Sequence, residues 1–127
     1  MIITVDEARA YFAHPSQQLG GLSPDNLPTD GVEYWADEGI CGAFHLAMWP
    51  GVYMAHYGVN PQAWGRLEAP AKRILTAFWQ ARQPQRIIGW TLASNRHAMS
   101  FAKRIGFTVD GQMPLSTDTL IMQGWTL

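Results

Sequence analysis

Hydrophobic and polar positions follow two periods along the chain. Apolar residues recur at helical spacing in three segments, and runs rich in aromatic and β-branched residues between turn signals are typical of strands. The pattern predicts helices over 5–14, 69–82 and 95–107, and strands over 31–36, 40–48, 52–59, 86–93, 107–111 and 118–127. Residues 15–31, rich in Pro, Gly, Ser and Asp, are predicted to form a surface loop.

Turn and capping residues define the ends of these segments. Thr4 and Glu7 have the spacing of a capping box before the first helix. Pro50-Gly51 predicts a hairpin turn between strands 40–48 and 52–59, and Pro70 suits the first turn of the second helix. The strand at 86–93 is apolar almost throughout, which favours burial on both faces.

The order of the elements predicts the fold class. Hairpin-connected strands come first, and a strand–helix–strand crossover occupies the middle of the chain. We therefore expect one α/β (α+β mixed) domain, residues 1–127, with a central mixed, mostly antiparallel sheet flanked by helices.

Composition excludes several classes of function. Apolar residues make up 47% of the chain and charged residues only 15%, which is a globular composition. The net charge is −1 with scattered cations, which argues against a nucleic-acid or anionic membrane partner. Cys41 is the only cysteine, and the sequence predicts a small buried residue there. We expect a cytoplasmic protein, and the six tryptophans make a homodimer or a protein partner plausible.

The third helix has a complete set of local signals. Asn95 is a good N-cap, and Ala98, Phe101, Ala102 and Ile105 share one face. Gly106 follows as the expected left-handed end residue. These features are consistent with a purely structural helix.

Two motifs in order make the chain resemble the GNAT superfamily of acyl-CoA N-acyltransferases. The first is Val-x-Pro at the end of a strand followed by a pyrophosphate loop, and the second opens the helix that follows a buried strand. The matching residues are Val59, Pro61, Gly65 and Ala69 in "VNPQAWGRLEA", and Asn95, Ala98, Gly106 and Phe107 in "NRHAMSFAKRIGF".

The resemblance implies acetyl-CoA as cofactor. Its pantetheine arm would lie where strands 52–59 and 86–93 diverge, and its pyrophosphate at the loop before the second helix, where free amides and the helix dipole suit an anion. The implied cofactor-binding residues are Tyr57, Val59, Trp64, Gly65, Arg66, Leu67, Ala69 and Asn95. Three positions depart from the family pattern. Trp64 and Leu67 replace smaller or polar loop residues, and Ala102 replaces the usual tyrosine acid.

Histidines are the candidate bases, because their pKa suits proton transfer near neutral pH. A symmetric Pro-Gly hairpin would place His45 directly opposite His56, with His56 near the divergence and therefore preferred as base. Glu33 on the neighbouring strand is an alternative base. The same histidines are also compatible with a structural role as strand residues bonded to neighbouring backbone, and the spacing gives no third ligand for a metal.

Two hypotheses of function follow. The first is an acetyl-CoA-dependent N-acyltransferase acting by direct transfer to a small-molecule or peptide amine. The second is a non-catalytic GNAT-fold protein that binds other proteins, similar to compact bacteriophage proteins associated with assembly. An open cleft between strands 52–59 and 86–93 would favour the enzyme, whereas Trp64 or Leu67 filling it would favour the second hypothesis.

Overall fold

The computed structural model describes residues 1–18 and 21–127. The strands are β1 Ile2–Ile3, β2 Val32–Asp37, β3 Ile40–Leu46, β4 Val52–Val59, β5 Arg86–Leu92, β6 Thr108–Pro114 and β7 Thr119–Trp125. The helices are α1 Val5–Ala8, α2 Glu68–Arg82 and α3 Arg96–Arg104, with 3₁₀ turns η1 Arg9–Phe12, η2 Pro15–Gln17 and η3 Pro61–Ala63. Most predicted elements agree with these bounds to within two residues. The two-residue strand β1 was not predicted.

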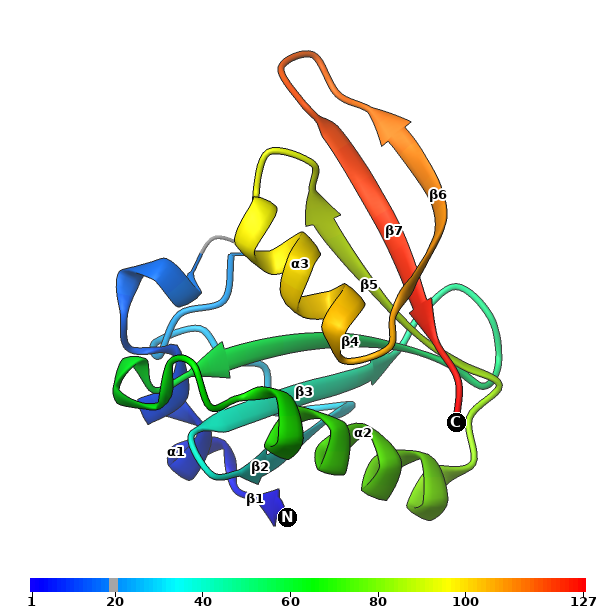
Figure 1. Ribbon diagram of the computed structural model, residues 1–127. Helices are drawn as coiled ribbons and strands as arrows, with labels where there is room; N and C mark the ends of the chain where they lie inside the picture. Colours follow the sequence, from blue (N-terminus) through cyan, green and yellow to red (C-terminus); the bar gives the residue numbers. More distant parts are fainter. Residues whose placement is uncertain (19–20) are drawn as a thin grey trace.

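The strands form one sheet in the order β1-β2-β3-β4-β5-β7-β6 (Figure 1). Of the strand pairs in the described chain, only β4 and β5 run parallel, joined by the crossover through α2. The predicted mixed, mostly antiparallel sheet flanked by helices is therefore confirmed.

Each face of the sheet has its own core. On one face, α2 supplies Ile74 and Phe78, and the Phe78 ring stacks on Phe44 of β3 at 4.0 Å. On the other face, Ala8 and Phe12 pack against Cys41 and Ala43 of β3. Neighbouring residues of β3 thus point into different cores, as the alternation of side chains along a strand requires.

The first predicted helix is shorter than expected. Thr4 and Glu7 form the predicted capping box, but the α-helix ends at Ala8 and the chain tightens into η1. A 3₁₀ turn is common at a helix end, and it still buries Ala8 and Phe12 on one side. The predicted loop 15–31 contains η2, and its residues 19 and 20 lie outside the described residues.

The β3–β4 hairpin differs in register from the prediction. Leu46 pairs with Tyr53, so His56 lies opposite Ala43 and His45 lies opposite Met54. The prediction that the two histidines are directly opposite was wrong by two residues. The connection is centred one residue earlier than Pro50-Gly51, with Met48 and Gly51 both at positive φ. A shift of two residues keeps both histidines on the same face, because side chains alternate with a period of two.

Strands β4 and β5 pair over only three residues. Val52, Tyr53 and Met54 face Arg86, Ile87 and Ile88, and beyond them the strands diverge. The predicted burial of strand 86–93 on both faces is correct for Ile87 and Ile88, whereas Trp90 and Thr91 are partly exposed. The first half of β5 lies in the core, and the second half borders the divergence.

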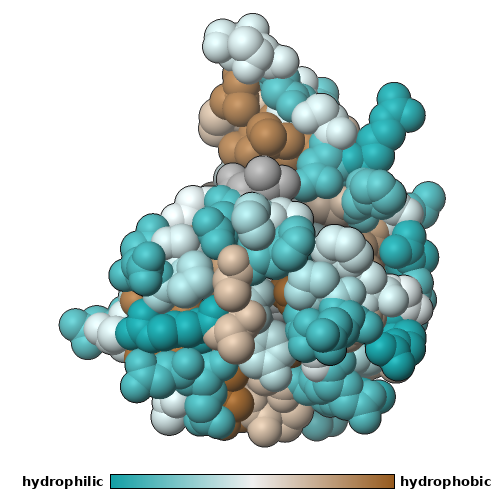
Figure 2. Space-filling view, turned by 90° about the vertical axis from the view of Figure 1, so that its left-hand side faces the viewer, coloured by the Kyte–Doolittle hydropathy of each residue, from teal (hydrophilic) through white to brown (hydrophobic). Residues whose placement is uncertain are grey.

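The β6–β7 hairpin extends beyond the rest of the molecule (Figure 1). Figure 2 shows apolar side chains gathered near its end, where Met113 and Leu115 are exposed. None of the helices in the described part of the chain has the length and apolar character needed to cross a membrane.

Candidate functional site: the divergence of β4 and β5

An apolar hollow lies where β4 and β5 separate. It has a volume of about 80 Å³ and is partly open to solvent. Its walls come from β3, β4, α2, β5, α3 and β7. Ala55 and Gly89 flank the point of separation, where a Cβ built on Gly89 would lie 3.6 Å from the Ala55 carbonyl oxygen.

The roof of the hollow is α3, whose cap is as predicted. The Asn95 side chain accepts a hydrogen bond from the Ala98 amide at 3.2 Å, and Gly106 has φ of +107°. No residue within α3 is fully buried, although Phe101 and Ala102 face the hollow. The predicted apolar face of α3 therefore covers an opening rather than a filled core. Tyr57 of β4 reaches the same place, with its ring 5.6 Å from that of Phe101.

One buried polar side chain lines the hollow. Gln123 of β7 is only 3% exposed, and its Oε1 accepts a hydrogen bond from Thr91 Oγ1 at 3.1 Å. Among the described residues, its amide nitrogen has no hydrogen-bond partner. Neither residue was predicted from the sequence as part of the site. The signal was a single glutamine in the otherwise apolar β7 run "LIMQGW".

The loop before α2 presents backbone amides. Asn60 caps η3 by accepting from the Gln62 amide, and the chain then reverses at Gly65, whose φ is +87°. Leu67 is the N-cap of α2 and has no side-chain capping bond. The amides of Glu68 and Ala69, in the first turn, have no partner within the helix, as at any helix start. A ligand with an anionic group finds donors and the positive end of the helix dipole here.

Neither Trp64 nor Leu67 fills the hollow. Trp64 is 54% exposed, and its ring meets the His14 ring edge-on at 5.7 Å. Leu67 is 8% exposed and packs in the core between α2 and the sheet. Its side chain points away from the loop surface, so it does not obstruct the free amides. A Cβ built on Gly65 would meet no atom within 4 Å, so the loop is also open at that position.

Charges of both signs surround the loop. Arg66 is exposed, and its guanidinium donates to the Gln62 carbonyl at 2.8 Å. Glu68 forms an ion pair with Arg104 at the end of α3, at 2.6 Å. The pairing offsets the negative charge that Glu68 would otherwise bring to an anion site at this helix start.

His56 and His45 lie together on the face opposite α2. His56 borders the hollow, and its Nε2 is 3.3 Å from Nε2 of His45. The two rings are nearly parallel, with an interplanar angle of 9°. Burial, and secondarily the charge of His45, lowers the pKa of His56 below its ordinary value. A neutral imidazole at physiological pH is the form that accepts a proton.

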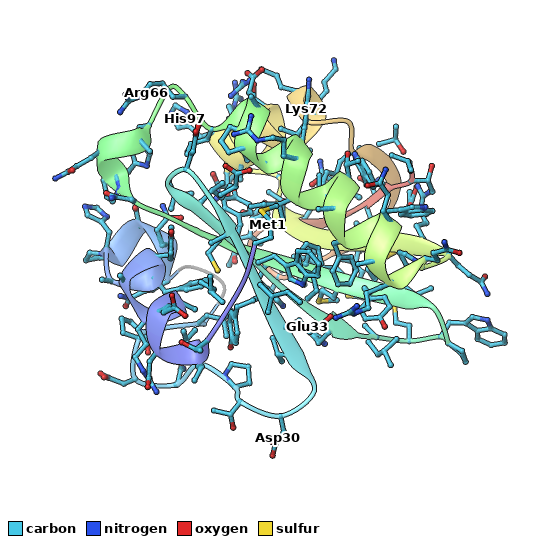
Figure 3. All side chains as sticks on the ribbon, turned by 90° about the horizontal axis from the view of Figure 1, so that it is seen from below. Met1, Asp30, Glu33, Arg66, Lys72 and His97 are labelled. Atoms are coloured by element: carbon cyan, nitrogen blue, oxygen red, sulfur yellow. The ribbon has the colours of Figure 1, made fainter. Side chains whose placement is uncertain are left out.

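Glu33 does not join the histidines. It lies opposite Phe44, on the face of the sheet that α2 covers, and its carboxylate pairs with Arg82 at 2.8 Å. Figure 3 shows Glu33 and Arg66 well apart, since Glu33 contacts Arg82 in the last turn of α2 whereas Arg66 contacts Gln62 before the helix begins. The structure therefore separates this alternative base from His45 and His56.

Residues 1–18 and 21–127 contain no cluster of three His, Cys, Asp or Glu side chains able to hold a metal ion. Cys41 is fully buried, as predicted, and burial raises the pKa of its thiol to about 12. A thiol with this pKa stays neutral and unreactive.

Comparison with known proteins identifies the architecture. No protein-family model and no curated protein sequence matches the chain. Among solved structures, the chain is similar to a ribosomal-protein-S5-alanine acetyltransferase from Vibrio fischeri, with a TM-score of 0.71 and 10% identity over 98% of this chain and 90% of that one. It is equally similar to smu.2055 from Streptococcus mutans UA159, with a TM-score of 0.71 and 13% identity over 98% and 96% of the chains.

A third similar structure is an acetyltransferase of the GNAT family from Bacillus anthracis, with a TM-score of 0.67 and 13% identity over 94% of this chain and 87% of that one. Identities this low establish the fold and no more. Together with the diverging β4 and β5 strands, these similarities show that the chain has the GNAT fold.

Proposed function

We propose that this protein is an acetyl-CoA-dependent N-acyltransferase that acetylates a small-molecule or peptide amine. The observation that carries the proposal is the divergence of β4 and β5 above an apolar hollow. Beyond Met54, the edge of β4 is not paired with β5, and an extended ligand with amide groups can add to such an edge as a strand does.

The residues present fit this cofactor. The amides of Gly65, Glu68 and Ala69 and the charge of Arg66 would hold the pyrophosphate. The backbone at Tyr57 and Val59 would pair with the pantetheine arm, and the free amide nitrogen of Gln123 provides a donor for a carbonyl group. Asn95 contributes indirectly by fixing the start of α3. When bound, acetyl-CoA would supply the acetyl group as a thioester, whose C–S bond is replaced by the C–N bond of the amide product.

His56 is the proposed base. It borders the hollow from the face opposite α2, and its lowered pKa keeps the ring neutral. An amine in water is mostly protonated, so removal of one proton restores the lone pair that attacks the acyl carbon. Glu33, held by Arg82 on the other face, is not a base in this proposal.

The positions of Trp64 and Leu67 bear on the non-catalytic hypothesis. That hypothesis expects one of them to occupy the cleft, yet both side chains lie elsewhere. Their placement supports cofactor binding over a purely structural role. Ala102, which replaces the usual tyrosine acid, is the departure that still favours the second hypothesis.

Calorimetry with acetyl-CoA tests the proposal. We expect binding to the wild type, loss of binding in Ala102→Trp, which fills the hollow, and wild-type binding in Lys103→Trp, which adds the same ring to the exposed side of α3. Thermal unfolding of both variants checks that they remain folded. A wild type that does not bind acetyl-CoA at millimolar concentration would falsify the proposal.

A further inference from the structure

The side chains of His45 and His56 approach each other through their Nε2 atoms. Their Nε2 atoms are 3.3 Å apart, their ring centroids are 5.4 Å apart and their planes are nearly parallel. The ring centroids are farther apart than the two Nε2 atoms, so each Nε2 lies on the side of its ring that faces the other ring. Because the planes are nearly parallel, the two nitrogens point roughly toward each other. That is the geometry of an N–H···N hydrogen bond, in which one ring donates and the other accepts.

A backbone carbonyl sets the direction of this hydrogen bond. His45 Nδ1 lies 3.2 Å from the Leu46 carbonyl oxygen, which can only accept. His45 Nδ1 therefore carries a proton, and in the neutral ring its Nε2 has the lone pair. His56 Nε2 must then be the donor between the rings. In neutral His56 the remaining nitrogen, Nδ1, has the lone pair.

The surroundings leave the basic nitrogen of His56 available. Within the described part of the chain, His56 Nδ1 has no hydrogen-bond partner. Titratable groups on the neighbouring elements are otherwise engaged or neutral: Arg9 pairs with Asp6, Tyr34 donates to the Pro28 carbonyl, and Cys41 is buried. Tyr11 lies on η1, His14 bonds Ser16 at the start of η2, and Arg86 pairs with Asp110 beyond β5. Of these groups, His45 is the one that forms a hydrogen bond with His56, so it is the group placed to exchange a proton with it.

We propose that His45 and His56 form a directional proton relay for the acceptor amine, with His56 Nδ1 as the proton-accepting atom and His45 as the positioning residue that receives the charge. This proposal rests on the proposed acyltransferase function. It assigns a role to His45 and names the reacting nitrogen of His56, neither of which follows from the fold.

In one turnover the nitrogen of the acceptor ammonium would lose two protons. Before attack, an N–H bond of the ammonium breaks and an N–H bond forms at His56 Nδ1. The His56 Nε2–H bond breaks and a bond forms at His45 Nε2, so His45 becomes the imidazolium while still donating to Leu46. After the C–N bond has formed, the second proton would end on the sulfur of coenzyme A as the C–S bond breaks, so that the free thiol is released. After the product leaves, Nδ1 of His56 loses its proton to water, the proton between the rings returns to His56 Nε2, and both rings regain their first tautomers.

Nuclear magnetic resonance tests the hydrogen-bonded pair without any cofactor. Two-bond ¹H–¹⁵N correlations at pH 8 report which nitrogen of each ring carries the proton. We expect Nδ1–H for His45 and Nε2–H for His56. The opposite tautomers, or His45 with its proton on Nε2, would overturn the relay.

Kinetics test the transfer itself with a matched pair of variants. The amide oxygen of Gln in His45→Gln can still accept from His56 Nε2 but cannot take up a proton, and His45→Phe removes both roles. We expect kcat to fall about 10- to 100-fold in both variants, with KM for acetyl-CoA unchanged. The Nε2–H tautomer of His56 should persist in the Gln variant.

The two proposals fail differently. Wild-type kcat in His45→Gln would reduce His45 to an orienting group and overturn the relay while leaving the acyltransferase intact. A wild type that neither binds acetyl-CoA nor acetylates amines would overturn the proposed function, even with the tautomers as expected.

Discussion

Strand β4 has two neighbouring strands, β3 and β5, and it pairs with them over different lengths. With β3 it pairs over seven residues, from Tyr53 to Val59, and both faces of that pair are packed. With β5 it pairs over three residues and then separates to border a hollow. A sheet loses backbone hydrogen bonds where strands diverge, so such a gap needs compensation from other groups. The contrast indicates that the β3–β4 pair provides stability, whereas the β4–β5 gap provides a place for a ligand.

Loss of the aromatic packing of α2 against the β3–β4 pair should have the largest effect on stability. Phe78 is fully buried, stacks on Phe44 and meets Tyr53 edge-on at 5.0 Å. We expect Phe78→Ala to reduce the free energy of unfolding by about 3–5 kcal/mol, because it leaves a cavity. Urea denaturation measures the change. A loss below 1 kcal/mol would show that α2 contributes little to the β3–β4 pair.

Glycines of the two regions provide a direct comparison. A Cβ on Gly58 of β4 would lie 2.7 Å from the Tyr11 carbonyl oxygen and 2.9 Å from the Phe12 ring, whereas at Gly89 the nearest atom is 3.6 Å away. We expect Gly58→Ala to cost about 1–3 kcal/mol and Gly89→Ala to change the stability by less than about 0.5 kcal/mol. Equal losses in the two variants would contradict the packing difference between the regions.

The pKa of His56 predicts a dependence of stability on pH. Because the folded-state pKa lies below the unfolded value near 6.5, the unfolded chain binds more protons as pH falls through that value, and the free energy of unfolding decreases. The loss is complete below the folded-state pKa. His56→Leu should flatten this part of the curve, measured by urea denaturation between pH 7.5 and pH 5. The exposed His97→Asn variant serves as control, and a curve unchanged by His56→Leu would be inconsistent with the pKa shift.

The smallest effect on stability should come from loss of the ion pair between Arg73 and Asp37, at the edge of the packed region. Arg73 of α2 donates to Asp37 of β2 at 2.8 Å, and this hydrogen bond lowers the pKa of Asp37. The contribution of the pair is present above the ordinary Asp pKa and is lost as pH falls through the lowered value. Since Arg73 is half exposed, Asp37→Asn should destabilise the protein less than Gly58→Ala. The order of their urea midpoints measures this.

The amino-acid sequence by itself determined the local structure. The Thr4–Glu7 capping box, the Asn95 cap and Gly106 at the end of α3 all depend on residues within four positions of one another. The bounds of strand 52–59 also follow from the local sequence, and the predicted and observed bounds agree. The GNAT fold was predicted from two motifs whose residues lie on these elements, because motif spacing reflects element lengths.

Only the tertiary structure decided how distant residues meet. The register of β3 and β4 depends on the loop geometry at Met48 and Gly51, and that register places His45 beside His56 through their Nε2 atoms. The burial of Leu67 and the pairing of Glu33 with Arg82 depend on α2 packing against the sheet. These outcomes follow from packing between segments far apart in the chain, which periodicity along the sequence does not encode.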